Sequence, residues 1–274
     1  MPILGDIALG KYVAGTSILH RLDPRTKLLV VVLWMSAALA SHGVAPVVAF
    51  CLFILATASL SRLPAGLLLR NLRSFLWLLL MTASLHALMT PGHLLWHVPW
   101  LDLDVTHEGL QAAAIFTLRL GAVVTAASLL TLTTSPLELT DGIERLLRPF
   151  RRIGVPAHEL AMMISIALRF IPVLAEEAER LQKAQMARGA EFGGHPVARA
   201  RKLVPLLVPL FLSAFARADR LAIAMEARGY RGGEGRTQYR QLAYRRADAL
   251  ATFVCVCGCG AMWWISATGV GLQP

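Results

Sequence analysis

The chain has 274 residues, of which 56% are hydrophobic and only 16% are charged, and its formal net charge is +10. A soluble domain has about 25% charged residues, so this composition excludes an ordinary soluble protein and indicates a membrane protein. Aromatic residues make up only 7% of the chain, and helix-forming residues are abundant, which favours membrane helices over a β-barrel.

Five apolar runs each come near the length of about twenty residues that a helix needs to cross a bilayer. The first run follows Asp23 and Pro24, a good N-cap and a good first helical residue, and extends to about Ser41. The other runs cover residues 44–60, 72–89, 109–133 and 249–268. The sequence therefore predicts an all-α membrane protein with about five transmembrane helices.

Basic residues are distributed unevenly between these runs. They occur in the N-terminal segment, in the connector after the second run and in the segment 134–246, which has 19 Lys and Arg against 11 Asp and Glu. The turn at 41–43 has none, and the loop at 90–108 is acidic. The positive-inside rule then predicts a multi-pass membrane protein with its N-terminus inside and its C-terminus outside. Cytoplasmic surfaces explain the net charge, so no nucleic acid partner is needed.

The segment 134–246 is too long for a connector and predicts a cytoplasmic helical domain. It separates a membrane domain at 1–133, with four spans, from a last span at 247–274. Within it we expect a short helix from Ser135 to about Pro149 and two long helices at 157–188 and 196–228. Apolar residues in both long helices recur every three to four positions, so each has one apolar stripe. We expect these helices to lie against the inner membrane face, or to cross each other there, and not to span the membrane.

The two long helices end in similar sequences. AERLQKAQMARG at 178–189 and ADRLAIAMEARG at 218–229 agree at seven of twelve positions, and Arg188 and Arg228 lie forty positions apart. A glycine after the arginine is suited to a left-handed C-terminal cap, and the arginine offsets the helix dipole. Capping alone would explain one copy. Two copies in the same position favour two docking arginines that fit two carboxylate-lined pockets of a partner.

At this point the chain resembles a known family, the transmembrane T component of energy-coupling-factor (ECF) vitamin importers. The resemblance covers nearly the whole chain. Its motifs are GKYVAGTSILHRLDPRTKLL, TTSPLELTDGIERLLRPFRRIGVP, ALRFIPVLAEEAERLQKAQMARG and AMEARGY.

The resemblance implies a non-catalytic coupling subunit with coupling helices at 134–246. Two ATP-binding-cassette ATPase subunits would bind the helix tips, and a small membrane S subunit would bind the vitamin. ATP and Mg would be bound by the ATPases, and this chain would need no cofactor of its own; it contains no phosphate-binding G-x-x-x-x-G-K-[ST] loop. The implied ATPase contacts are Ala187, Arg188, Gly189, Ala227, Arg228 and Gly229.

Two arginines in apolar surroundings stand apart from this pattern. Arg119 lies in the middle of the fourth run, so it should face protein or water and not lipid. A partner within the bundle and a contact with the S subunit both stay open for it. Arg169 lies on the polar flank of the first long helix, where we expect a solvated or headgroup-bound arginine.

A metal site is not favoured by the histidines or the cysteines. His93 and His97 are four positions apart, with His86 and His107 nearby, but the prolines of this loop disfavour the helix that would bring them together. Cys255, Cys257 and Cys259 lie in the last run without the spacing of a zinc site.

Two other function classes remain to be weighed. A membrane-embedded enzyme acting on a lipid or polyisoprenoid would need polar catalytic groups at the inner interface, where the chain offers Asp141, Glu144, His158 and Glu159 without paired metal-ligand spacing. A secondary transporter would need inverted repeats and acidic residues at mid-membrane, which the sequence lacks. The vitamin or metal imported, and whether the module is shared among S subunits, are not specified by the sequence.

Overall fold

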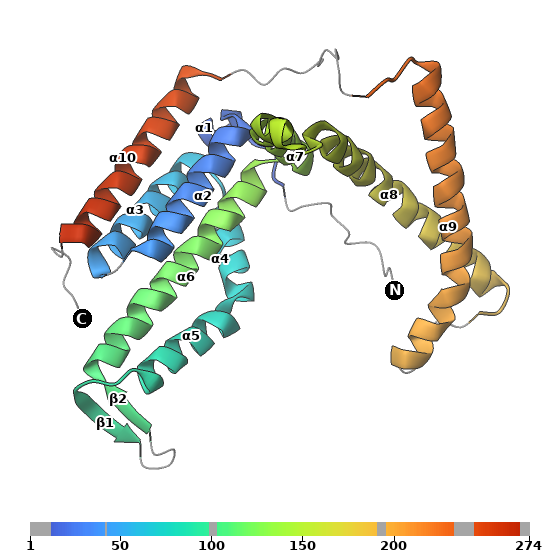
Figure 1. Ribbon diagram of the computed structural model, residues 1–274. Helices are drawn as coiled ribbons and strands as arrows, with labels where there is room; N and C mark the ends of the chain where they lie inside the picture. The colour runs from blue at the N-terminus through green and yellow to red at the C-terminus, as the bar shows by residue number, and fades with distance from the viewer. Residues whose placement is uncertain (1–11, 42, 99–102, 191–195, 233–243, 269–274) are drawn as a thin grey trace. The chain divides into compact units, whose positions relative to one another are not determined.

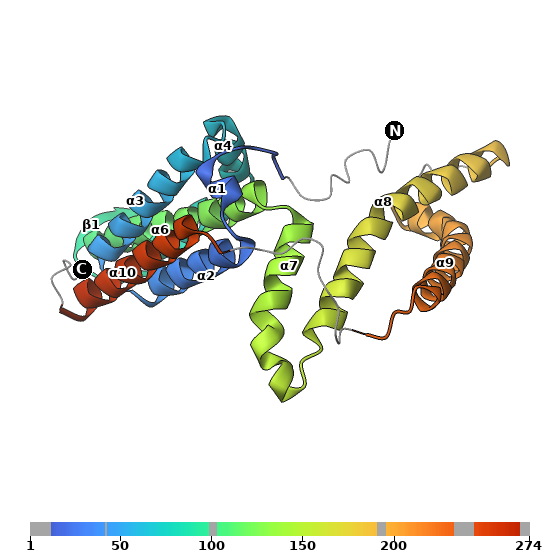
Figure 2. The ribbon, with the colours of Figure 1, turned by 90° about the horizontal axis from the view of Figure 1, so that it is seen from above.

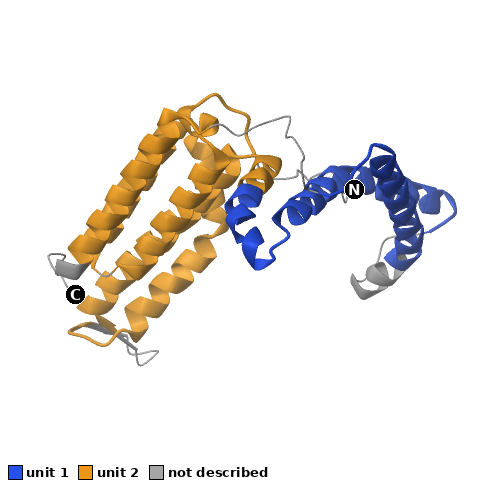
Figure 3. Ribbon diagram, turned by 45° about the horizontal axis from the view of Figure 1, so that its top comes forward, with its two compact units in different colours: residues 1–9, 143–241 blue, residues 10–142, 242–274 orange. Residues whose placement is uncertain are grey.

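The computed structural model describes residues 12–41, 43–98, 103–190, 196–232 and 244–268. The chain divides into two compact units, which are coloured separately in Figure 3. We call residues 10–142 with 242–274 the bundle unit and residues 1–9 with 143–241 the long-helix unit. The predicted all-α membrane fold is confirmed.

The bundle unit consists of helices and one β-hairpin. Its long helices α2, α3, α6 and α10 run side by side in both views (Figures 1 and 2). The elements are α1 (Ile18–Arg21), α2 (Pro24–Ala40), α3 (Val44–Ser61), α4 (Ala65–Ser74), α5 (Leu76–Met89), β1 (Leu94–Val98), β2 (Leu103–Thr106), α6 (His107–Thr133) and α10 (Arg246–Thr268).

The predicted start of the first long helix is confirmed. α2 begins at Pro24, and the Asp23 carboxylate accepts a hydrogen bond from the backbone N–H of Arg25 at 3.0 Å. This bond satisfies one of the N–H groups that a helix leaves unpaired at its first turn. Two sequence signals, an N-cap and a proline, therefore set this boundary.

The span predicted at 72–89 is not one continuous helix. α4 and α5 meet at Phe75 and are bent by 59° relative to one another. α4 carries Arg70 and Arg73 among leucines, whereas α5 is apolar throughout apart from a few small polar residues and His86. A segment with charged side chains is disfavoured in hydrocarbon, so the chain changes direction where the basic part ends.

The loop after α5 contains secondary structure that the sequence reading missed. β1 and β2 pair in an antiparallel hairpin, with Leu94 opposite Thr106 and Val98 opposite Leu103. Thr106 then caps α6, because its hydroxyl accepts a hydrogen bond from the backbone N–H of Gly109 at 3.0 Å. The hairpin thus leads directly into the longest helix of the bundle unit.

Trp34 lies at the centre of the bundle core. Its ring stacks on Phe53 at a centroid distance of 3.8 Å and lies 6.2 Å from the ring of Phe50. α10 approaches the indole closely at Gly258, where a Cβ atom would overlap the ring. The core therefore depends on a large residue in α2 facing a glycine in α10.

In the part of the chain that the structure describes, four helices are long and apolar enough to cross a membrane, namely α3, α6, α8 and α10, and the bent pair α4 and α5 makes up to five. α3, α6 and α10 agree with predicted spans. α2, at 17 residues, is shorter than these, and α8, which we expected at the membrane surface, passes the same test. It stays a prediction that α2 crosses the membrane and that α8 does not.

The helices between α6 and α10 agree closely with those that the sequence predicted, and all but the first part of α7 (Pro136–Leu147) belong to the long-helix unit. α7 leads through a 3-10 helix (Arg148–Ile153) to α8 (Ala157–Ala187), and α9 (Pro196–Ala227) follows. Pro172 in α8, and Pro205 and Pro209 in α9, lie inside helices that stay continuous. α8 and α9 pack against each other. The division of the chain at 133 and 246 stays a prediction.

Candidate functional site

The end of α8 is closed by a glycine in the left-handed conformation. Arg188 is the C-cap, and Gly189 follows with φ +86°. The N–H of Gly189 donates to the Met186 carbonyl at 3.0 Å, and the N–H of Ala190 donates to the Gln185 carbonyl at 3.0 Å. These two bonds define a Schellman motif, which satisfies carbonyls that the helix end leaves unpaired.

The end of α9 repeats this geometry. Gly229 has φ +74° and donates to the Glu226 carbonyl at 2.8 Å, while the N–H of Tyr230 donates to the Met225 carbonyl at 3.0 Å. Arg228 occupies the C-cap position, as Arg188 does in the first copy. The predicted left-handed glycine caps are therefore confirmed at both helix ends, and the two local backbones match.

Both tip arginines are exposed, and neither forms an ion pair with a residue that the structure describes. Each guanidinium projects from the negative end of a helix of more than thirty residues. A planar, always charged group on a rigid support can bind a carboxylate with two hydrogen bonds. The two tips are therefore suited to contacts with acidic groups of another molecule. Such contacts stay a prediction.

The helices that carry the tips also expose apolar surface. In α9, Phe211, Leu212, Phe215 and Ile223 are each more than half exposed, whereas Leu206 is buried. Exposed apolar area of this extent is typical of a surface that contacts lipid or another protein. Arg169 of α8 is exposed, in agreement with the expectation for it.

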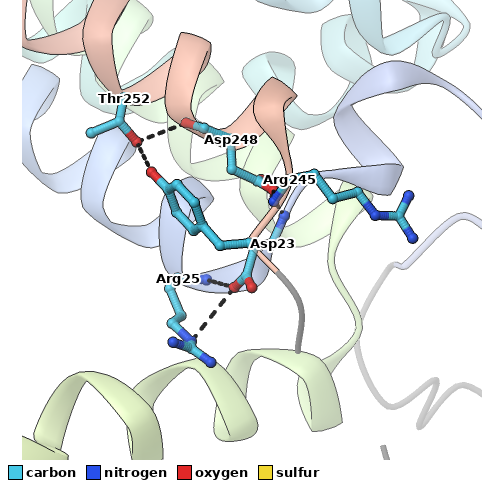
Figure 4. A network of polar contacts seen from close by, with 6 residues as sticks. Asp23, Arg25, Arg245, Asp248 and Thr252 are labelled. Carbon is cyan, nitrogen blue, oxygen red and sulfur yellow. Dashed lines mark hydrogen bonds and ion pairs between the residues drawn. The ribbon is translucent and has the colours of Figure 1, made fainter. Parts of the chain in front are cut away.

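A buried polar cluster joins the first turns of α2 and α10 (Figure 4). One carboxylate oxygen of Asp248 accepts a hydrogen bond from the backbone N–H of Asp23 at 2.7 Å, and the other accepts from the backbone N–H of Arg245 at 2.8 Å. Asp248 is 1% exposed. One side chain therefore caps its own helix and also holds the start of α2, a role that the sequence reading missed. The signal available in the sequence was an acidic residue directly before the last apolar run.

Lys27 ties α2 to the end of α6. Its ammonium donates to the Thr133 carbonyl at 3.0 Å and to the Thr134 hydroxyl at 3.2 Å, and the side chain is buried. From the sequence we expected this lysine to be a charge on the cytoplasmic surface. The structure shows that it is an internal donor.

Arg119 has a partner inside the bundle unit. Its guanidinium donates to the Ser41 carbonyl at 2.8 Å and lies 5.2 Å from the ring centroid of Phe116. The carbonyl is at the C-terminal end of α2, where helix carbonyls lack intrahelical donors. Of the two possibilities left open for Arg119, the structure shows the partner within the bundle. A contact of Arg119 with a second protein stays a prediction.

The histidines of the 86–108 region do not converge on one point in the part of the chain that the structure describes. His86 stacks on Phe116 at 4.2 Å, and the backbone N–H of His93 donates to Glu108 at 2.6 Å. The side chain of His97 lies outside the described residues. Among the described residues no group of three or more His, Cys, Asp and Glu side chains could hold a metal ion.

The polar residues weighed for an enzyme lie in α7 and in the first turn of α8. Of these, Glu144 of α7 and His158 of α8 are hydrogen-bonded at 2.9 Å. This bond connects the short helix to the first long helix. It therefore has a structural use, and it requires no substrate.

Comparison with known proteins gives consistent matches along the chain. The family model described as CbiQ, cobalt transport protein, matches residues 15–239. An energy-coupling factor transporter transmembrane protein, EcfT, of Acidaminococcus fermentans is 51% identical over 253 residues, covering 92% of this chain and 94% of the relative. The EcfT protein of Thermosediminibacter oceani is 50% identical over 91% of this chain and 93% of the relative. That of Bacillus subtilis is 46% identical over 90% and 93%. The chain therefore belongs to the CbiQ cobalt transport protein family, as a transmembrane component of energy-coupling factor transporters.

Proposed function

We propose that this chain is the subunit that couples two ATPase subunits to a substrate-binding S subunit in an ATP-driven importer of a vitamin or other micronutrient. The observation that carries the proposal is the pair of matching helix ends, each with an exposed arginine before a left-handed glycine. Two equal tips fit two equal acidic sockets, as a dimer or pseudo-dimer of ATPases would offer. The residues assigned to these contacts are Ala187, Arg188, Gly189, Ala227, Arg228 and Gly229.

In this proposal the ATPases bind ATP and Mg, and this chain transmits their movement without catalysing a reaction. A change in the spacing of the two ATPases moves the tips, and α8 and α9 carry the displacement because a continuous helix is stiff along its axis. The exposed apolar side chains of α9 give the S subunit and the lipid bilayer a surface to contact. Arg119 is a further candidate for an S-subunit contact.

We place the N-terminus inside and the C-terminus outside a prokaryotic cytoplasmic membrane. The basic segments support this orientation, because they lie on one side when the predicted spans alternate. The bundle agrees with the alternation in one respect. The start of α2, the end of α6 and the start of α10 meet at the polar cluster of Asp23, Lys27 and Asp248, so these three ends share one side.

The experiment is capture of the ATPase subunits by the purified, tagged chain in detergent. Arg188→Glu and Arg228→Glu should each weaken capture about tenfold or more, because each places a negative charge against an acidic socket. Arg169→Glu, an equal charge change at an exposed position of α8 away from the tip, should leave capture unchanged. Unaltered capture and uptake by the double tip variant would show that the tips are not the docking residues.

A further inference from the structure

Two open cavities adjoin one another in the bundle unit. One, of about 380 Å³, is lined by Thr16, Ser17, Arg21, Ser59 and Arg62, with Ile18 and Leu60 at its edge. The other, of about 430 Å³, is a groove between α1, α2, α3, α6 and α10. Ile18 and Leu60 belong to both linings. A single elongated molecule could therefore occupy both.

The smaller cavity, which we call the basic pocket, has the composition of an anion site. Arg21 and Arg62 are exposed, and neither forms an ion pair with any described residue. The lining also includes the hydroxyl groups of Thr16, Ser17 and Ser59, and none of its described residues is acidic. The Ser17 hydroxyl is hydrogen-bonded to His20 and the Ser59 hydroxyl donates to the Ala56 carbonyl, so the two guanidinium groups are the main donors available to an anion. Guanidinium groups are typical ligands of a phosphate group.

The backbone of Arg62 has a conformation that is unfavourable for an arginine. Its φ of 52° and ψ of 24° are left-handed, and it is the only non-glycine residue with positive φ in the described part of the chain. It is the C-cap of α3, and the left-handed position at a helix end is usually taken by glycine or asparagine. Arginine is unusual at such a position, and here its side chain lines the basic pocket together with that of Arg21.

The larger cavity, which we call the apolar groove, suits a hydrocarbon chain. Its walls are mainly aliphatic and aromatic side chains, among them Val30, Val31, Phe53, Leu130, Leu250 and Val254. Three of the helices that form it, α3, α6 and α10, are long and apolar enough to cross a membrane. The groove therefore lies among helices that would themselves be in contact with lipid.

We propose that the basic pocket and the apolar groove together bind one anionic phospholipid. The phosphate lies between Arg21 and Arg62, and one acyl chain follows the groove past Ile18 and Leu60. A basic pocket beside membrane-spanning helices is a common form of lipid headgroup site. The lipid site does not depend on whether the helix tips dock a partner.

The test is native mass spectrometry of the purified full-length chain, delipidated and mixed with dioleoylphosphatidylglycerol or dioleoylphosphatidylcholine. We expect a one-to-one adduct with phosphatidylglycerol that is retained at least about tenfold better than phosphatidylcholine, because only the former has a net negative headgroup. Equal retention of the two lipids would contradict the headgroup assignment.

Variants test each half of the site separately. Arg21→Gln with Arg62→Gly should lose the preference for phosphatidylglycerol, and Arg62→Gly also relieves the left-handed strain, so misfolding would not be the cause. Arg70→Gln with Arg73→Gln removes the same charge from α4, outside both linings, and should keep the preference. Ala251→Phe should lower retention of both lipids by filling the groove. If neither the arginine pair nor Ala251→Phe alters retention, the lipid binds elsewhere and the proposal is wrong.

A competition arm separates a lipid from a soluble phosphate compound. Glycerol 3-phosphate and inorganic phosphate, each at tenfold excess over the lipid, should leave the phosphatidylglycerol adduct in place, since they lack the acyl chain. Displacement by either would show a soluble phosphate site instead of a lipid site.

Discussion

Asp248 makes two bonds whose loss should be measurable as stability. Replacement by alanine leaves the backbone N–H of Asp23 without its acceptor, in a residue that is 6% exposed. An unsatisfied buried donor of this kind costs about 1–3 kcal/mol. The N–H of Arg245 belongs to an exposed residue and can be rehydrated, so its lost bond costs about 0.5–1.5 kcal/mol. We therefore expect Asp248→Ala to lower the free energy of unfolding by about 2–4 kcal/mol.

The measurement is thermal unfolding of the full-length chain in detergent, followed by circular dichroism. A loss of this size corresponds to a fall in Tm of roughly 5–15 °C for a chain of this length. Asp248→Asn keeps one acceptor oxygen but turns an amide N–H₂ toward a donor, so its Tm should lie between those of the parent and Asp248→Ala. Asp219→Ala, at an exposed position of α9, is the control and should change stability by less than about 0.5 kcal/mol. If Asp248→Ala has the same Tm as Asp219→Ala, the buried carboxylate does not hold α2 to α10.

Three further substitutions test the geometry in the same melting assay. Lys27→Met should lower the free energy of unfolding by about 2–3 kcal/mol, because the last carbonyl of α6 and the hydroxyl after it lose a charged donor; an unchanged Tm would mean that water replaces the ammonium. Gly258→Ala should cost about 1–3 kcal/mol through overlap of the new methyl group with the Trp34 ring. Gly229→Ala should cost about 1–2 kcal/mol, since alanine disfavours a φ of +74°. Gly260→Ala, where a Cβ meets no atom within 4 Å, is the control for both glycines and should not lower the Tm.

The regular parts of the long-helix unit could be predicted from sequence because their signals are local. A helix boundary depends on a few neighbouring residues, and the structure ends α8 at Ala187 and α9 at Ala227, within a residue of the predicted ends. The glycine caps follow from the same local chemistry, since only glycine adopts positive φ without strain. The duplicated Ala-Arg-Gly and the family resemblance required no contacts at all.

The parts that the sequence did not predict depend on contacts between elements. β1 pairs with β2, and α4 and α5 both pack against α6, and a hydropathy run records neither kind of contact. The basic pocket likewise joins residues near 20 with residues near 60. The left-handed backbone of Arg62 could not be predicted from the sequence, because an arginine is common at the end of an apolar run.

Sequence alone determined that this is a helical membrane protein, which family it resembles, and where two long helices end in arginine and glycine. Tertiary structure alone decided what the buried charges do. Asp23 and Asp248 are separated by 225 positions, and Lys27 and Thr133 by 106, yet each pair meets within hydrogen-bond distance. Hydropathy and capping describe each helix by itself, whereas a buried charge is stable only where another helix supplies its partner. The physical reason is that the free-energy cost of burying a charge arises at the residue itself, whereas the hydrogen bonds that offset this cost come from residues distant in the sequence.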